Sequence, residues 1–479
     1  MFNSRSAAGQ RESEPTIALD DLRVGMFIHL DGGWLSHPFA RSSFKIANAQ
    51  QIATLRGLKL ERVRWSPELS DAAPAHGGRL HGDASANADS GEAAGATSPG
   101  AATTTTAADP HSADAHAAPA QPAAGRAAAS AIHSPAAAAH TAALAAERHA
   151  QHQCEQQFAE AAHAWRRASD ALPAQPAAAR AAADTLANAL TDKLMTDGDV
   201  GIRLLPGGGN DRAAAHALNV TVVSMLLARS LGLPRDDLAE IALGALLHDV
   251  GKLDLPERVR HIEAGCSLAE ANAYREHVAR GITAAQRMGL PAGALAVIAQ
   301  HHEHADSSGF PARISGDRMS LAGRIVAIVN RYDNLCNPAT RTPPLTPHEA
   351  VAMLFAHGRT RFDPSVLNAF IRMMGVYPAG SLVQLTDERY AMVVAVNSTR
   401  PLKPRVLVHE AGVPRSEALL LDLEGERDVG IRRSLPAAKV PEAALQYLDP
   451  RPRVAYFFEA LASVGAALRE PAGDRLAVA

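Results

Sequence analysis

The segment Ala245–Val259, with the sequence ALLHDVGKLDLPERV, decides how the whole chain is read. Its first residues continue an apolar helical face that starts at Leu238, and Gly251 is a typical helix stop. His248 and Asp249 follow each other at the end of that helix. Consecutive side chains on a helix diverge by about 100°, so this pair can reach two different metal ions with the carboxylate between them. Because imidazole and carboxylate are ligands for Fe, Mn and Zn, the pair predicts a metal centre.

Four further histidines of the same helical region, residues 210–374, are candidate metal ligands. They are His216, His277, His301 and His302. Each alone would more often be an ordinary interior or surface histidine, and a His-His pair before a loop is more often accidental than catalytic. As a set they lie in one helical region and at or near apolar helix faces, where an unpaired polar group costs free energy. The set therefore favours one shared metal site.

The composition sets aside several classes of protein. Lysine and arginine total 47 and aspartate and glutamate 50, which gives the 479 residues a formal charge of −3. With basic and acidic residues nearly balanced, the chain has no overall excess of positive charge that would indicate binding to DNA, RNA or a membrane surface. Three cysteines are too few for a disulfide framework and suit a reducing compartment. Since the sequence also shows no signal peptide and no run of roughly 18 apolar residues, we expect a cytoplasmic protein.

Five zones of composition predict the domain organisation of a mainly α protein. Residues 16–70 form a small N-terminal α+β accessory domain, with a short helix between strand patterns. Residues 71–146 are rich in Ala, Ser, Thr, Gly and Pro, which predicts a disordered linker. Residues 147–209 are alanine-rich and helical, and they connect to an all-helical bundle over residues 210–374. Alternating runs between turn residues predict a small β-rich extension at residues 375–460.

Several motifs in the helical region occur together and in a fixed order. Besides His216 and the segment quoted above, they are REHVARG around His277, IAQHHEHADSSGFP ending at Pro311, RIVAIVNRYDNL ending at Leu335, and FDP at Phe362–Pro364. On these residues the region resembles the HD-GYP branch of the HD-domain metal-dependent phosphohydrolases, and the HD-type helical bundle is its expected fold. The segment LRVGMFIHL and the cluster Trp34, His37, Pro38 and Phe39 resemble the accessory domain often found ahead of HD-GYP domains.

The resemblance implies a phosphodiesterase that hydrolyses cyclic di-GMP to the linear dinucleotide or GMP in bacterial second-messenger signalling. It also implies two divalent metal ions, Fe or Mn. The first ion would be held by His216, His248 and Asp249. The second would share Asp249 and be held by His277, His301 and His302. Two metal ions about 3.5–4 Å apart can hold a phosphate between them and activate a water molecule, which is the chemistry that phosphodiester hydrolysis needs.

The resemblance assigns further roles near the phosphate. Lys252 and Asp249 would be catalytic, with Lys252 neutralising charge on the phosphoryl oxygens. Lys252, Phe310 and Arg341 would contact the substrate. The plain alternative for Lys252 is a solvated helix end, and for the cluster around Trp34 it is a structural aromatic core.

This chain departs from the family pattern at several of these positions. Asn330 stands where the family has an aspartate metal ligand, which removes a negative charge and weakens the hold on metal. Phe310 replaces the tyrosine of the Gly-Tyr-Pro signature, and Ser307 stands where a glycine is expected. Ile262 replaces a common lysine, and the basic residues expected after Asp333 are reduced to Arg341. These changes reduce both the negative charge of the metal ligands and the contacts to the substrate phosphate, so we expect reduced turnover.

Three functions stay open on the sequence alone. The first is a cyclic di-GMP phosphodiesterase weakened by Asn330. The second is a catalytically degenerate HD-GYP module that binds nucleotide or a signalling partner, such as a diguanylate cyclase. The third is a nucleotide phosphomonoesterase of the wider HD superfamily. A homodimer is compatible with each of them.

Overall fold

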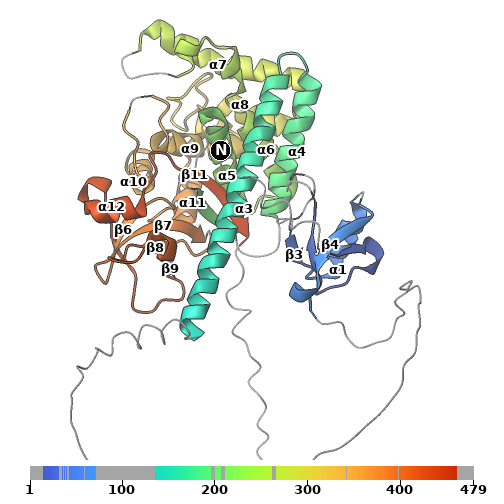
Figure 1. Cartoon of the computed structure of the whole chain (residues 1–479). Helices are drawn as coiled ribbons and strands as arrows, with labels where there is room; N and C mark the ends of the chain where they lie inside the picture. Colours follow the sequence, from blue (N-terminus) through green and yellow to red (C-terminus); the bar gives the residue numbers. More distant parts are fainter. Residues whose placement is uncertain are drawn as a thin grey trace, which may run out of the picture.

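The computed structural model describes residues 15–460, apart from 32–34, 36, 38, 40–42, 59, 72–134, 196–199, 206–210, 262–265, 341 and 398. These residues form a small N-terminal sheet domain and a larger body in which helices and a seven-stranded sheet share one core (Figure 1). The mainly helical fold class predicted from the sequence is confirmed. Most of the predicted linker lies outside the described residues.

The N-terminal domain is a four-stranded antiparallel sheet with one helix, and its strand order is β1-β4-β2-β3. The elements are β1 (Thr16–Ala18), β2 (Phe27–His29), β3 (Ser43–Lys45), α1 (Ala49–Gly57) and β4 (Arg62–Ser66). Asn48 begins α1 by accepting a hydrogen bond from the backbone of Gln51. Ile28 and Leu55 are fully buried in the core between sheet and helix. His37 is buried next to Phe39, whereas Trp34 and Pro38 lie outside the described residues.

The helical bundle carries the candidate site. Its helices are α3 (Pro135–Ala171), α4 (Pro176–Leu194), α5 (Arg212–Ser230), α6 (Arg235–Leu247), α7 (Leu268–Met288), α8 (Ala292–Gln300), α9 (Leu321–Cys336), α10 (Pro347–His357) and α11 (Pro364–Met374). The ends of these helices follow local sequence signals. Ser267 and Glu270 form a capping box that begins α7, and Gly289, with φ of 67°, ends it. Thr346 and Glu349 begin α10 in the same way.

A seven-stranded sheet closes the body, with the order β10-β6-β7-β5-β11 and with β8 and β9 continuing from β7. Its elements are β5 (Val200–Leu205), β6 (Leu382–Leu385), β7 (Tyr390–Asn397), β8 (Arg405–Val408), β9 (Leu419–Asp422), β10 (Ile431–Ser434), α12 (Glu442–Leu448) and β11 (Ala455–Ala460). The helical prediction for residues 147–209 is therefore wrong at its end, because β5 is a strand. It pairs with β7 and β11, which lie far away in the sequence and give no local signal.

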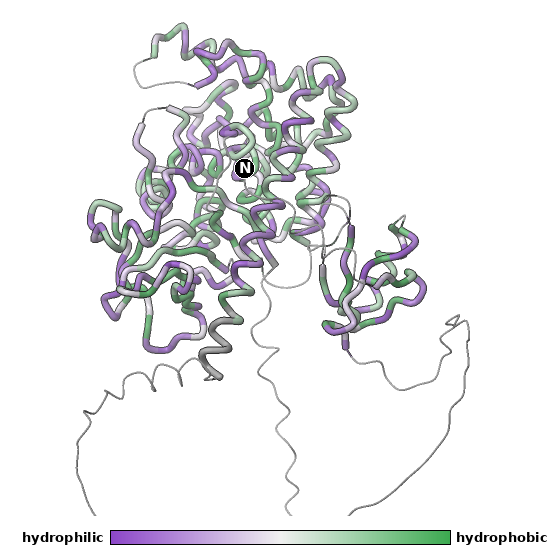
Figure 2. The backbone as a smooth tube through the Cα atoms, viewed as in Figure 1, coloured by the Kyte–Doolittle hydropathy of each residue, from purple (hydrophilic) through white to green (hydrophobic). Residues whose placement is uncertain are grey.

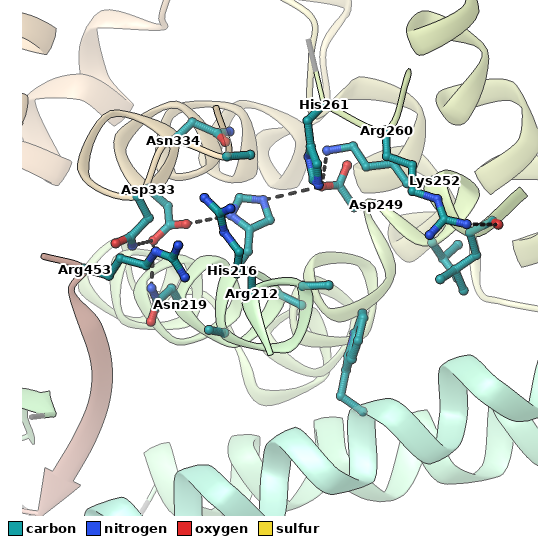
Figure 3. A pocket seen from close by; sticks show the side chains of 18 of the residues that line it. Arg212, His216, Asn219, Asp249, Lys252, Arg260, His261, Asp333, Asn334 and Arg453 are labelled. Carbon is teal, nitrogen blue, oxygen red and sulfur yellow. Dashed lines mark hydrogen bonds and ion pairs between the residues drawn. The ribbon is translucent and has the colours of Figure 1, made fainter. Parts of the chain in front are cut away.

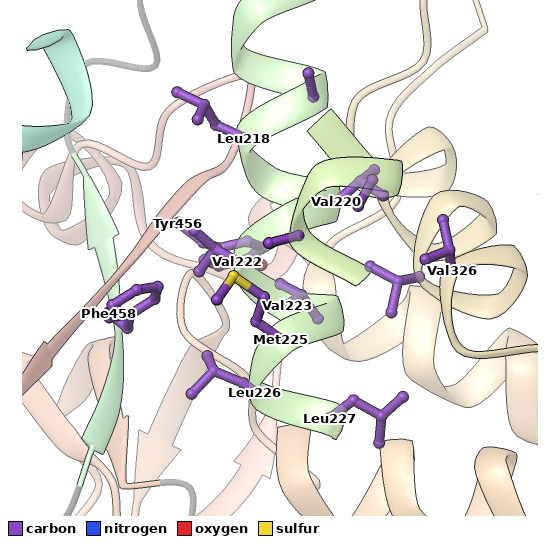
Figure 4. Close-up of a cluster of buried hydrophobic side chains, with 14 of the residues drawn as sticks. Leu218, Val220, Val222, Val223, Met225, Leu226, Leu227, Val326, Tyr456 and Phe458 are labelled. Carbon is purple, nitrogen blue, oxygen red and sulfur yellow. The ribbon is translucent and has the colours of Figure 1, made fainter. Parts of the chain in front are cut away.

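Helix α5 lies at the centre of the shared core, and apolar residues gather along the inner elements of the body (Figure 2). Every residue from Ala217 to Ala228 on this helix is buried. Figure 4 shows Val222 and Met225 of α5 beside Tyr456 and Phe458 of β11. The C-terminal strand thus packs directly on the helix that carries His216.

In the described part of the chain, no helix combines the length and the apolar character that crossing a membrane requires.

Candidate metal centre

Three of the predicted ligands form a first group at one end of α5 and α6. His216 comes from the first turns of α5, and His248 and Asp249 follow the last residue of α6. The Nε2 atoms of both histidines lie 3.5 Å from Oδ2 of Asp249 and 3.1 Å from each other. All three ligand atoms lie within 4.8 Å of one another, which is the spacing of groups that can hold one ion.

A second group shares Asp249 and adds histidines from the next two helices. His277 lies on α7, and His301 and His302 follow the last residue of α8. Nε2 of His277 lies 3.5 Å, and Nε2 of His301 3.7 Å, from Oδ1 of Asp249. The four ligand atoms of this group also lie within 4.8 Å of one another. One carboxylate thus presents Oδ2 to the first group and Oδ1 to the second.

Hydrogen bonds to the far side of the rings fix their orientation. Nδ1 of His248, His277 and His301 donates to the backbone carbonyl three residues earlier, at 2.7, 2.6 and 2.8 Å. Since a carbonyl oxygen can only accept a hydrogen bond, these rings carry their proton on Nδ1. Nε2 therefore has a free lone pair, and it faces Asp249. His216 reaches the same state through Oδ2 of Asp333, which lies 2.6 Å from its Nδ1.

The charges of the site are those that metal ligands need. Burial lowers the pKa of His277 to about 4, and it holds the pKa of His301 and His302 well below the usual range. Burial disfavours the ionised form of Asp249, but Lys252 and the neighbouring histidines hold the pKa of its carboxyl well below the usual value. The second group therefore combines the neutral imidazoles of His277, His301 and His302 with an ionised Asp249 at neutral pH.

A close backbone contact brings the two groups together. The 3-10 turn Val250–Asp254 follows Asp249 and packs against α7. A Cβ on Gly251 would lie 1.9 Å from the carbonyl oxygen of His277 and 2.4 Å from the nitrogen of Gly281. Only glycine permits this approach, which sets Asp249 beside His277. Oδ1 of Asp249 is buried with no hydrogen-bond partner among the described residues, so the donor set fits a metal ion better than a satisfied polar core.

Lys252 lies beside this shared carboxylate. Its ammonium nitrogen donates to Oδ2 of Asp249 at 2.6 Å and lies 5.2 Å from the ring centre of Tyr274. The hydroxyl of Tyr274 lies 3.5 Å from Nε2 of His302. Tyr274 was not among the residues predicted from the sequence. It stands three residues before His277 on α7, and that helical spacing was the available signal.

Phe310 and its loop pack against the second group. The Phe310 ring stacks on His302 with ring centres 4.4 Å apart. Glu303 is 1% exposed and accepts the backbone N–H groups of Ala312 and Arg313, which fixes the loop from inside. Ser307 has a φ of 62°, in the left-handed region that favours glycine, and this is the physical reason for the glycine expected there.

Asn330 is buried on α9 and lines a cavity together with His301 and His302. Its amide oxygen accepts a hydrogen bond from Asn334 at 2.8 Å. The ligand role predicted for Asn330 remains a prediction. Arg341 and Ile262, which our sequence analysis also singled out, lie outside the described residues.

A pocket of about 260 Å³ opens beside the first group (Figure 3). His216, Asp249 and Lys252 line it together with cationic side chains that the sequence analysis did not select as ligand contacts. These are Arg212 at the start of α5, Arg260 after the 3-10 turn, and Arg453 just before β11. His261 lines the pocket as well, and burial together with the nearby Lys252 and Arg212 lowers its pKa. The pocket thus joins the candidate metal ligands to positive charge, which is the environment that a phosphate requires.

The chain is similar to known proteins in two parts. Residues 206–366 match the family model of the HD domain, and residues 15–183 match a domain of unknown function, DUF3391. A cyclic di-GMP phosphodiesterase of Pseudomonas aeruginosa is 30% identical over 40% of this chain and 47% of that protein. The cyclic di-GMP phosphodiesterase response regulator RpfG of Xanthomonas campestris is 31% identical over 31% of this chain and 40% of that protein.

A 3'3'-cGAMP-specific phosphodiesterase of Vibrio cholerae is 30% identical over 33% of this chain and 30% of that protein. The chain therefore spans less than half the length of these relatives. Among solved structures, the HDG"Y"P protein Bd1817 of Bdellovibrio bacteriovorus matches with a TM-score of 0.36 and 18% identity, over 45% of this chain and 71% of that chain. The resemblance to HD-GYP proteins with an N-terminal accessory domain is confirmed by the two family matches and the phosphodiesterase relatives.

Proposed function

We propose that this chain, which carries an HD domain at residues 206–366, is a metal-dependent phosphodiesterase that hydrolyses cyclic di-GMP. The observation that carries the proposal is the shared carboxylate of Asp249, which has one oxygen in each of two ligand groups. The relatives named as cyclic di-GMP phosphodiesterases support the choice of substrate. The product is the linear dinucleotide or GMP.

His216, His248 and Asp249 would hold one divalent ion, and Asp249, His277, His301 and His302 would hold the other. Nitrogen ligands with one carboxylate suit Fe or Mn. Such a pair of ions lowers the pKa of water and neutralises phosphate charge. Asp333 fixes the ring of His216 from behind, and the three backbone carbonyls do the same for the other buried rings.

Lys252 acts on the phosphate by its charge. Burial alone would lower its pKa, but the carboxylate of Asp249 and the Tyr274 hydroxyl raise it above the usual value. A lysine with a raised pKa keeps its proton at neutral pH. It therefore stabilises negative charge on the phosphoryl oxygens and is a poor proton donor to the leaving group. Phe310 stacks on His302 and lines the cavity on the other side of the centre.

The test is hydrolysis by the purified full chain loaded with Mn²⁺ or Fe²⁺. We expect conversion of cyclic di-GMP, followed by chromatography, and loss of conversion in the double variant H248A/D249A. A parallel assay with 3'3'-cGAMP tests the second cyclic dinucleotide named among the relatives. Conversion of neither substrate above the level of the double variant would refute the proposal.

Asn330 favours a second candidate, an HD module that binds the nucleotide without turning it over. Its amide is neutral and its oxygen accepts a hydrogen bond from Asn334, so it offers a metal ion less than a carboxylate does. This candidate predicts binding of cyclic di-GMP by the wild-type chain with no product. The metal content of the purified chain separates the two, because hydrolysis requires both ions and binding does not.

A further inference from the structure

Two arginines that are far apart in the sequence line the pocket beside the first ligand group. Arg212 is the first residue of α5, and Arg453 precedes β11. Figure 3 shows both arginines near His216, with Asp249 and Lys252 farther along the pocket. Partial burial of Arg212, and then repulsion by the positive charge of Arg453, lower the pKa of the Arg212 guanidinium. Both guanidinium groups belong to the lining of one pocket, where their like charges repel each other.

Neither charge is neutralised by a carboxylate among the described residues. Arg212 donates one hydrogen bond to the backbone carbonyl of Pro338 and keeps its other donors. The adjacent Asp211 caps α5 through the N–H groups of Ala213 and Ala214. By contrast, Arg451, two residues before Arg453, pairs with Asp449 at 3.1 Å. Both side chains are exposed to solvent, so their remaining donors are accessible to an anion, which would relieve the repulsion between them.

The backbone beside Arg453 is held in place by side chains of the helical bundle. The carbonyl of Val454 accepts hydrogen bonds from Asn219 at 3.0 Å and Asn337 at 2.9 Å. The N–H of Val454 donates to Asn337, also at 2.9 Å. The same two amides each donate to Oδ1 of Asp333, the residue that orients His216. Arg453 is therefore positioned by the network that positions a candidate metal ligand.

The carboxylates of the pocket are already engaged. Asp333 accepts from His216, Asn219 and Asn337, and Asp249 accepts from Lys252. The free charge at this end of the pocket is consequently positive. Paired arginines bind phosphate groups through several parallel hydrogen bonds.

We propose that Arg212 and Arg453 form a second anion subsite of the pocket, which holds the phosphodiester of the cyclic dinucleotide that is not being hydrolysed. The inference rests on the proposed function, because it takes the first phosphodiester to lie at the two ligand groups. A cyclic dinucleotide carries its two phosphodiesters on opposite sides of one ring, so a site for it needs positive charge at two places. The C-terminal extension thereby contributes a residue that contacts substrate.

The test compares the variants R212M and R453M with the wild-type chain in equilibrium binding. The control is R451M, which removes the same charge from the same segment outside this pocket. The probe is the bis-phosphorothioate analogue of cyclic di-GMP, which resists hydrolysis, measured with Mn²⁺ and again after EDTA treatment. We expect each variant to weaken binding of the analogue about tenfold in both conditions, and R451M to leave it unchanged.

A second ligand checks which phosphate the arginines hold. GMP has a single phosphate, which the Mn²⁺-loaded ligand groups and Lys252 would take, so its affinity with Mn²⁺ should not change in either variant. Equal weakening of GMP and of the analogue would overturn the assignment, as would unchanged binding of the analogue in R212M and R453M. If the wild-type protein binds neither ligand, the proposed function itself is refuted. If the wild-type protein binds the analogue but R212M and R453M bind it equally well, only the arginine subsite is refuted.

Discussion

Asn330 shows how one missing charge can limit a metal centre. It lies on α9 within the cavity that His301 and His302 line, and Asn334 donates to its amide oxygen. An aspartate at this position would keep one oxygen for Asn334 and offer the other, with a full negative charge, to a metal ion. We expect N330D to raise the metal content per chain after purification, measured by inductively coupled plasma mass spectrometry, and to raise hydrolysis with it.

The control for this substitution is N188D, which makes the same change on the exposed face of α4. N188D should leave the metal content unchanged. If N330D also leaves it unchanged, Asn330 does not limit metal binding, and its proposed role as a weak ligand is wrong.

At the scale of elements, the turn after α6 and the helix α7 form the centre by touching each other. Gly251 lies so close to the backbone of His277 and Gly281 that a Cβ atom at this position would overlap both. We expect G251A to push the turn away from α7, to lower the free energy of unfolding by about 3 kcal/mol and to release metal. Urea unfolding and metal analysis measure the two effects.

The matched control is G425A, because a Cβ at Gly425 meets only an ordinary contact at 3.7 Å. A G251A protein that unfolds like the wild type and retains its metal would show that the close approach does not build the centre.

At the scale of the molecule, a buried ionic network fastens α3 to the C-terminal sheet. Arg203 of β5 is 1% exposed and bonds both Glu459 of β11 and Glu147 of α3. Glu147 also accepts from Arg405 of β8 at 2.6 Å. Burial opposes ionisation of Glu147, but the two arginines lower its pKa below the usual 4.5. Its charge therefore stabilises the fold above that pH, and this contribution is lost as the pH falls through the lowered pKa.

The variant E147Q tests this contribution. It should lower the free energy of unfolding by about 2 kcal/mol at pH 7. The difference from the wild type should shrink as the pH falls below 4.5 and through the lowered pKa, where the wild-type carboxylate also becomes neutral. Urea unfolding at several pH values measures it, and E155Q on the same helix should show no such trend. A difference that stays constant with pH would contradict the ionic role of Glu147.

The sequence predicted the parts of this site that local spacing determines. His248 and Asp249 are neighbours, His301 and His302 are neighbours, and each pair ends a helix with a clear apolar face. The partners of β5 could not be predicted, because strand pairing with β7 and β11 joins residues that share no local pattern. The same holds for Asn219 and Asn337, which are far apart in the sequence and converge on Asp333 and the backbone of Val454.

The pairing of β5 with β11 also sets an order of events during synthesis. Arg203 and Glu459, which bond across this pair, are 256 residues apart. When β5 leaves the ribosome, its later partner does not yet exist, and α5 still lacks the strand that covers its apolar side. The nascent chain must keep this open edge from pairing with other chains until β11 emerges. A chain cut after residue 374 would keep the edge open permanently, so it should aggregate even though all its candidate metal ligands are present.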